Sequence, residues 1–349
     1  MTAAGEQPAG TVPVKPARGL TYRLSVMAKC VIATGLALTP FTAFLVLGWL
    51  TRLMRREAVI ARIQTGRQVS RADALGALQT DAALSVLARF PGWWSGLWAT
   101  VVDGLRATLA VAALIAPFGL TLMVAWWAGW ENSFNKGYEQ AWVGPLLGLT
   151  GVGLGIVLLS HLPMAFAHFA TEGRLRAAFD LALVRRLIRA VRWRYVLLSL
   201  ATVLLSAPLF VAQILPTFME KINPALINAD AATVAKIAFQ WHLGATIYLI
   251  ITLIILRKWA ARLYGRATLS LASEHEIAVA HLTRSLTTNS GGGETAPRSR
   301  VGGIAAGLIT AAAWLGFFVM LYIAQFANHA WWNWINHPIV GLPWVFRPL

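Results

Sequence analysis

The stretch ATLAVAALIAPFGLTLMVAWWAGW, residues 107–130, contains 24 consecutive residues without a charge. A helix needs about 20 apolar residues to cross a hydrocarbon core about 30 Å thick. Four other uncharged runs are at least this long or nearly so: Gln140–Thr171, Tyr195–Met219, Ile237–Leu256 and Val301–Phe346. None alternates apolar and polar residues with the period of two that a β-barrel strand requires. The sequence therefore predicts an all-α, polytopic transmembrane helical bundle.

The composition excludes several other classes of protein. Of the 349 residues, 57% are hydrophobic and only 13% are charged, about half the charged fraction of a soluble domain. The formal net charge of +16 does not indicate nucleic-acid binding until the position of the charges is known. The single cysteine, Cys30, excludes an internal disulfide framework and a cysteine-based metal cage. We expect no cytosolic enzyme, no nucleic-acid partner and no metal site.

The positive charge is confined to four segments between the apolar runs. Residues 1–29, 52–106, 172–194 and 257–300 carry the whole net charge, and the remaining four basic and four acidic residues cancel. Positively charged loops stay on the cytoplasmic side of a membrane. We therefore expect a cytoplasmic N-terminus and a C-terminus on the outer face.

The run Cys30–Thr51 conflicts with this orientation, because basic segments flank it on both sides. Pro40 lies near its middle, where it would remove a helical hydrogen bond and clash with the preceding turn. A re-entrant helical hairpin turning near Pro40 resolves the conflict if neighbouring helices bury the bend. A sixth span is the alternative, since the charge rule is statistical. The bundle then has five full spans plus a Pro-broken hairpin or a sixth span.

The expected organisation has five parts. They are a basic N-terminal segment (1–29), a membrane helical domain with cytoplasmic amphipathic connectors (30–287), a Gly/Ser-rich flexible linker (288–300), a final transmembrane helix (301–327) and a Trp-rich outer-face tail (328–349). The linker predicts that the final helix is mobile or docks separately.

Residues 172–194 are predicted to form an amphipathic helix at the cytoplasmic leaflet. Its apolar positions recur at i+4: Leu175, Phe179, Leu183, Leu187 and Val191. Its basic surface includes Arg174, Arg185, Arg189 and Arg192. We expect these arginines to contact lipid phosphates or, alternatively, an acidic partner.

Small residues line one face of two predicted spans. Gly144, Gly148, Gly151 and Gly155 share a face of the third uncharged run, and Gly303 and Gly307 do so in the last span. Missing side chains let a second helix or a flat cofactor approach closely. We predict helix packing at these glycines.

The chain contains sixteen tryptophans, most of them near predicted span ends, as in an aromatic belt. Trp331, Trp332 and Trp334 are expected to lie in a tail on the outer surface, facing lipid or a neighbouring subunit. His329 and His337 flank them and are expected to be solvated.

Three histidines are candidate ligands of a haem or chlorin metal. His161 and His168 lie seven residues apart on one predicted helix, and His242 lies near the outer end of another. Two axial ligands must come from facing helices at matched depth, which this placement does not supply. Polar packing is therefore the expected role, and cofactor binding stays an alternative.

The sequence contains no motif for hydrolysis or nucleotide binding. The predicted membrane interiors also lack Asp, Glu, Lys and Arg, the usual mark of ion coupling and proton relays. We therefore expect no enzymatic activity and no ion-coupled transport.

Three short motifs carry a family resemblance: Gly48-Trp49-Leu50-Thr51-Arg52, Val102-Asp103-Gly104-Leu105 and Glu172-Gly173-Arg174-Leu175. They resemble an uncharacterised family of bacterial multi-span membrane proteins, a domain of unknown function, over roughly residues 30–215. The resemblance implies a bacterial inner-membrane protein and no assigned activity.

The leading functional hypothesis is a non-catalytic integral subunit or scaffold of a larger inner-membrane complex. Its partners would be membrane lipids and other integral membrane subunits. A permease for a neutral or lipidic substrate is one alternative. A haem- or pigment-binding subunit for electron transfer or light harvesting is the other.

Overall fold

The computed structural model describes residues 19–80, 93–129, 142–222, 224–269, 271 and 300–345. Every regular element in these ranges is helical. The long helices are α1 (Gly19–Ala37), α2 (Pro40–Arg67), α5 (Trp93–Trp126), α6 (Val143–Glu172), α7 (Leu181–Ile214), α9 (Ala231–Ala267) and α11 (Arg300–Ala327). The short ones are α3 (Arg71–Thr80), η2 (Leu175–Phe179), η3 (Leu215–Phe218), α8 (Met219–Ile222), η4 (Pro224–Asn228) and α12 (Trp332–Ile335).

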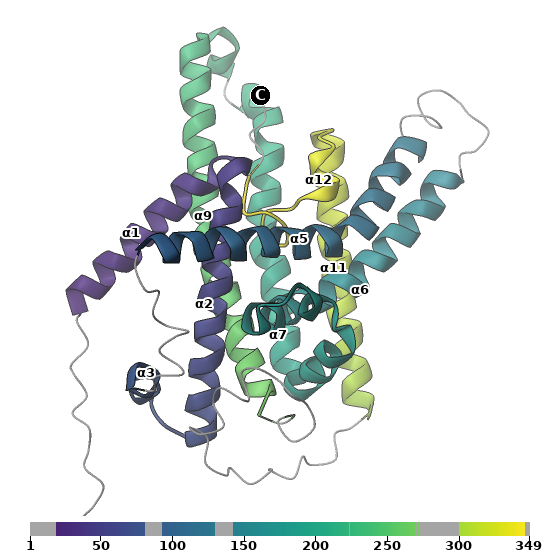
Figure 1. The fold of residues 1–349 in the computed structure, drawn as a ribbon. Helices are drawn as coiled ribbons and strands as arrows, with labels where there is room; N and C mark the ends of the chain where they lie inside the picture. Colours follow the sequence, from purple (N-terminus) through teal and green to yellow (C-terminus); the bar gives the residue numbers. More distant parts are fainter. Residues whose placement is uncertain are drawn as a thin grey trace, which may run out of the picture.

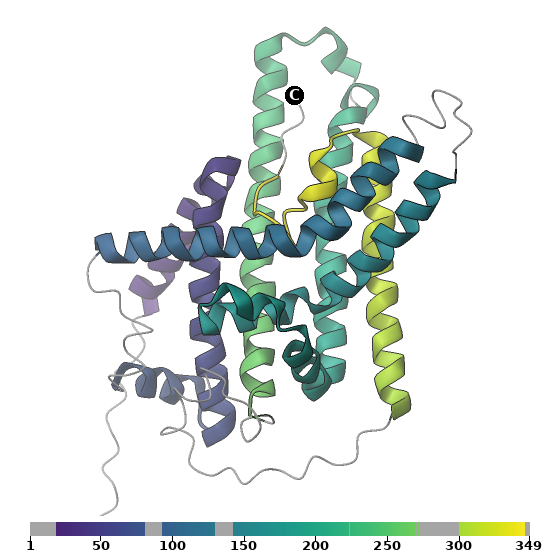
Figure 2. The same cartoon turned by 45° about the vertical axis from the view of Figure 1, so that its right-hand side comes forward.

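The predicted all-α bundle with five spans is confirmed. In the described ranges, five helical segments are long and apolar enough to cross a membrane: Gly96–Gly129, Val143–Glu172, Leu181–Phe218, Ala231–Ala267 and Arg300–Ala327. Helices α2, α7, α9 and α11 run roughly side by side, and the first half of α5 crosses them (Figures 1 and 2). The C-terminal half of α5 and the N-terminal half of α6 lie side by side and are inclined to the other helices, and α11 and α12 pack against them (Figure 2).

The run around Pro40 contains a helix break at the predicted place. Helix α1 ends at Ala37, and α2 begins at Pro40, where proline is tolerated because its missing N–H would have no helical partner. The second arm is longer than expected, because α2 continues for 28 residues to Arg67. Residues 52–67, expected as part of a surface connector, therefore extend this arm through the bundle.

The prediction of one amphipathic helix over 172–194 is wrong. Helix α6 ends at Glu172, the next residue, Gly173, has a left-handed φ of 68°, and the 3-10 helix η2 follows. The Asp180 carboxylate then accepts a hydrogen bond from the Leu183 amide at 3.1 Å and caps a new helix, α7. The i+4 stripe is thus divided: Leu183 is buried, whereas Phe179 on the other side of the break is exposed.

Helix α7 then bends at Arg192, which has non-helical φ and ψ angles of 21° and −93°. The basic segment and the span that follows it are therefore one bent helix. Residues 181–191 keep the amphipathic character that the sequence predicted.

The expectation that the whole C-terminal tail lies on the surface is also wrong. Trp331 and Trp332 are exposed, but Trp334 is only 1% exposed. The Trp334 ring lies 5.7 Å from that of Trp126 and 5.0 Å from that of Tyr322. A tail with so many large apolar groups removes more apolar surface from water by folding back onto α5 and α11 than by lying on the outer surface.

Asn336 closes a loop in the part of the tail that folds back onto the bundle. Its side chain accepts a hydrogen bond from the Leu342 amide at 2.6 Å and donates one to the Leu342 carbonyl at 3.3 Å. The loop closed in this way carries His337, Ile339 and Val340, all buried. His337 was expected to be solvated; instead its ring packs 4.4 Å from that of Phe210.

Helix α11 is an integral part of the core and does not dock separately. It packs along α7, with Trp314, Phe317 and Phe318 buried at its centre. The predicted linker, apart from Arg300, lies outside the described residues, as do residues 1–18 of the N-terminal segment.

Candidate functional site

The second half of α2 presents charged side chains to the interior of the bundle. We name Arg52, Arg55, Glu57 and Arg62 the α2 charge cluster. Glu57 and Arg62 are buried, and Arg52 and Arg55 are partly buried. The cluster links α2 to four other helices.

The two arginines nearer the start of α2 bind backbone oxygens of the next spans. Arg52 donates to the Gly96 carbonyl at 2.7 Å and also contacts the Thr100 hydroxyl, both on α5. Burial lowers the pKa of Arg52 to about 10, and the nearby Asp103 carboxylate offsets part of that shift. Arg55 donates to the Ala170 carbonyl of α6 at 2.6 Å. Both arginines therefore add polar contacts that join α2 to α5 and to α6.

Glu57 joins three helices through ion pairs. Its two carboxylate oxygens accept hydrogen bonds from Arg71 of α3 at 2.6 Å and from Arg262 of α9 at 3.2 Å. Burial alone would raise the pKa of Glu57, but the two arginines outweigh it and hold that pKa below its usual value. Glu57 is therefore ionised in the neutral range. One turn further on, Arg62 donates to the Thr268 hydroxyl at 2.9 Å.

Two glycines let α2 and α5 cross in backbone contact. A Cβ added at Gly48 would lie 2.8 Å from the Gly104 nitrogen, and one added at Gly104 would lie 3.0 Å from the Phe44 carbonyl carbon. The crossing places Arg52 directly against α5. The motifs that suggested the family resemblance, distant in sequence, thus contact one another.

The third motif adjoins the same region. Arg106 of α5 donates to the Gly173 carbonyl at 3.4 Å, and a Cβ at Gly173 would lie 3.3 Å from an Arg55 nitrogen. Arginines of α2 and α5 therefore fix the point where α6 ends and the basic segment begins.

The basic segment presents its arginines outward. We name the exposed set the basic platform: Arg174, Arg176, Arg185, Arg186, Arg189 and Arg194. Leu183, Val184 and Leu187 on the opposite side are buried in the core. Arg192, at the bend, is only half-buried and lies 3.5 Å from the position of a Cβ at Gly303 of α11.

The structure does not bring the three candidate histidines together. His161 donates from Nδ1 to the Val157 carbonyl of its own helix at 2.7 Å. Nδ1 of buried His168 lies 2.9 Å from the Tyr264 hydroxyl of α9. His242 is on α9 too, 22 residues before Tyr264, which corresponds to about 33 Å along a helix. His168 and His242 therefore cannot be axial ligands of one metal.

The glycines of α6 lie where the helix meets its neighbours. An added Cβ would lie 2.6 Å from the Gly129 nitrogen at Gly144 and 3.2 Å from the Tyr322 hydroxyl at Gly148. At Gly151 it would lie 2.8 Å from Leu122, and at Gly155 it would lie 2.8 Å from the Phe318 ring. Gly307 of α11, in contrast, has nothing within 4 Å of an added Cβ.

The region that matches a known protein family contains the α2 charge cluster. A family model described as a protein of unknown function (DUF4013) matches residues 31–219. The chain belongs to the DUF4013 family. No curated protein and no solved structure matches the chain. The matched region contains α2 and its contacts with α5 and α6, so the family segment includes all four residues of the α2 charge cluster, whereas the partners Arg262 and Thr268 lie outside it.

The cluster could not be predicted while residues 52–67 were assigned to a connector between spans. One signal was present: no proline or glycine interrupts the chain between Trp49 and Thr65. A helix entering that stretch has no sequence reason to end there.

Proposed function

We propose that this DUF4013 protein is a non-catalytic integral subunit or scaffold of a larger assembly in the bacterial inner membrane. The basic platform carries the proposal, because its exposed arginines sit on a backbone that the bundle holds in place. Arg55 and Arg106 fix its beginning, and Leu183 and Leu187 bury its inner side. A fixed array of positive charges suits the recognition of anionic groups.

In this proposal the platform faces the cytoplasm, in accord with the preference of basic loops for that side. The N-terminus is then cytoplasmic, and the C-terminal tail is on the outer half of the bundle. The platform contacts anionic lipid head groups and acidic segments of other membrane subunits. The apolar outer faces of the spans contact lipid and partner helices.

The packing of the bundle centre favours a scaffold over a permease. Phe210, Phe317 and Phe318, from α7 and α11, form edge-on contacts with ring centroids 5.2 Å and 5.8 Å apart. An alternating-access path would have to separate these rings. Such a close-packed interior suits a static element.

The test is recovery of the protein from native membranes with its neighbours. After crosslinking and mild extraction, we expect stoichiometric integral partners, identified by mass spectrometry. Replacing Arg185, Arg186 and Arg189 together with alanine should reduce partner or anionic-lipid recovery several-fold. A variant with Lys221→Ala and Lys236→Ala, which removes two exposed positive charges beyond the other end of the bundle, is the control, and the Arg185→Ala/Arg186→Ala pair is the variant matched to it in charge. A crosslinked preparation that contains only the monomer would refute the proposal.

A further inference from the structure

Arg257 of α9 is a buried cation in an unusual setting. It is 5% exposed, and its guanidinium carbon lies 4.2 Å from the centroid of the Phe166 ring on α6. A desolvated contact of this kind is favourable. An aromatic face nevertheless supplies no lone pair for the five N–H donors of a guanidinium.

The other interior arginines have acceptors, as Arg55 has in the Ala170 carbonyl and Arg62 has in the Thr268 hydroxyl. Within the described ranges, Arg257 forms no hydrogen bond and no ion pair with another residue. An arginine stays charged even when buried. Burying one without a counter-charge costs several kcal/mol. The site is therefore chemically incomplete with protein groups of the described chain alone.

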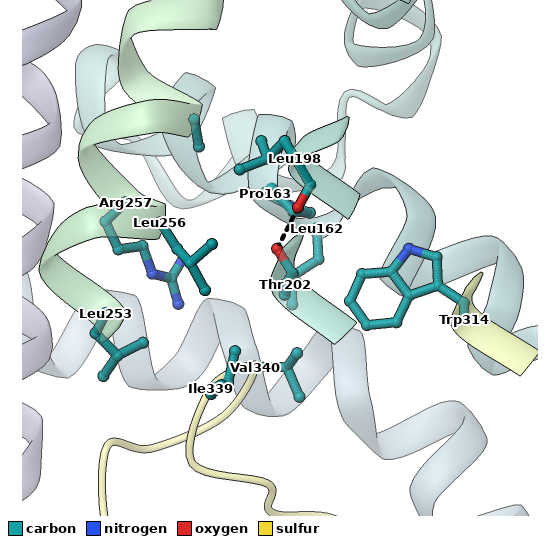
Figure 3. Close-up of a pocket in the computed structure, with 11 residues that line it drawn as sticks. Leu162, Pro163, Leu198, Thr202, Leu253, Leu256, Arg257, Trp314, Ile339 and Val340 are labelled. Atoms are coloured by element: carbon teal, nitrogen blue, oxygen red, sulfur yellow. Dashed lines mark hydrogen bonds between the residues drawn. The ribbon is translucent and has the colours of Figure 1, made fainter. Parts of the chain in front are cut away.

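A cavity of about 20 Å³ adjoins this guanidinium. On this measure a single water needs roughly 10–15 Å³, so the cavity has room for one water or one small ion and excludes a lipid head group. Figure 3 shows the Arg257 side chain reaching in from α9, with Ile339 and Val340 of the tail below it and Trp314 across from it. The cavity is therefore closed in part by the C-terminal tail.

The rest of the cavity lining offers little compensation for the charge of Arg257. They are largely apolar, with Leu198 and Trp314 among them, and the Thr202 hydroxyl donates to the Leu198 carbonyl at 2.8 Å. The guanidinium is therefore the main hydrogen-bond donor available to a molecule or ion in the cavity. A water molecule would accept one hydrogen bond and leave the charge uncompensated. A small anion would accept the hydrogen bond and neutralise the charge.

We propose that this cavity binds one small inorganic anion of the size of chloride, with Arg257 as its counter-ion. Because Ile339 and Val340 line the same cavity, the bound anion also stabilises the folded-back tail. The site is independent of the basic platform, and neither proposal depends on the other.

The first test measures thermal unfolding of the full chain in nanodiscs of zwitterionic lipid. Sodium chloride is compared with sodium gluconate, an anion too large for the cavity, at equal ionic strength. We expect a saturable rise in Tm of about 3 °C in chloride. The rise should vanish in R257Q and persist in K258Q, which removes the neighbouring positive charge. Equal Tm values in the two salts, or an unchanged rise in R257Q, would overturn the proposal.

A second measurement uses the unaltered protein, in case R257Q does not fold. Crystals grown in bromide should give an anomalous peak in contact with the Arg257 guanidinium. A data set with bromide peaks only elsewhere would count against the site. Stabilisation by nanodiscs of anionic lipid that depends on Arg257, with none by chloride, would show that Arg257 compensates its charge with a lipid phosphate and would overturn the proposal for a free ion.

Discussion

Gly155 of α6 is the position at which one added methyl group should matter most for the α6–α11 contact. A Cβ there would lie 2.8 Å from an edge carbon of the Phe318 ring. Phe318 is 1% exposed and makes edge-on contacts with Phe118 and Phe317, each with centroids 5.8 Å apart. The ring cannot move away from α6 without disturbing one of these pairs.

The expected loss follows from three terms. Overpacking a filled core costs about 1–3 kcal/mol, and each disturbed aromatic pair costs about 0.5–1.5 kcal/mol. Alanine returns about 1 kcal/mol over glycine inside a helix. Gly155→Ala should therefore lower the free energy of unfolding by about 2 kcal/mol. Gly153→Ala, on the same helix with nothing within 4 Å of the added Cβ, should raise it by up to about 1 kcal/mol.

The two variants carry the same chemical change two residues apart, so their difference of about 3 kcal/mol isolates the contact with Phe318. It can be measured by titrating the protein from mild detergent into SDS and following helicity by circular dichroism. Phe318→Leu should relieve part of the cost of Gly155→Ala, giving a non-additive double-mutant cycle. Equal stability of the two alanine variants, or strictly additive losses with Phe318→Leu, would refute the reasoning.

Three further perturbations probe other parts of the bundle. Gly48→Ala should cost about 2 kcal/mol in the same titration, because the added Cβ meets backbone of α5 that has no rotamer to change; Gly76→Ala, in open space, should not. Glu57→Gln should cost about 1–2 kcal/mol by leaving Arg71 and Arg262 without their carboxylate. Since the folded pKa of Glu57 is below 4.5, its contribution is complete above pH 4.5 and disappears as the pH falls through the folded value, so the variant should lose less stability on acidification. Burial lowers the pKa of His337 from 6.5 to about 3. The unfolded state therefore binds the proton first, and limited proteolysis should detect increasing release of the tail as the pH falls below 6.5, with His337→Phe resistant. Tail cleavage that does not change with pH, or that rises equally in His337→Phe, would contradict this last expectation.

The five spans could be predicted because each is encoded locally, by about 20 or more residues without a charge. The position of α2 could not. Its charged half is stable in the interior because Arg262, 205 residues later in the chain, reaches Glu57. The sequence of residues 52–67 contains no information about that partner. Its basic composition alone therefore predicts a surface connector.

The position of the C-terminal tail was predicted wrongly for a different reason. Tryptophans near a span end are typical of an interfacial belt, and the same composition serves a segment folded back onto the bundle. Trp334 is buried partly because Gly119 of α5 offers no side chain there: a Cβ at Gly119 would lie 2.7 Å from the Trp334 carbonyl oxygen. The burial of Trp334 thus depends on a glycine more than 200 residues away in the sequence, which the tail sequence alone does not reveal. The basic segment, in contrast, had a local signal, since Gly173 and Asp180 are typical helix-ending and helix-capping residues.

The DUF4013 match ends at residue 219, but the interior of the family segment is completed by α9, which lies beyond it. Tyr264 of α9 is the partner of His168, and Thr268 is the partner of Arg62. Gly265, between them, lets α9 approach so closely that an added Cβ would lie 3.1 Å from the Ala58 carbonyl carbon of α2. Without α9, Glu57 would also lose one of its two arginines, and a buried charge without its partner is costly. The matched segment is therefore a part of a fold whose polar interior needs a further helix, and in this chain the helix that supplies it also carries Arg257.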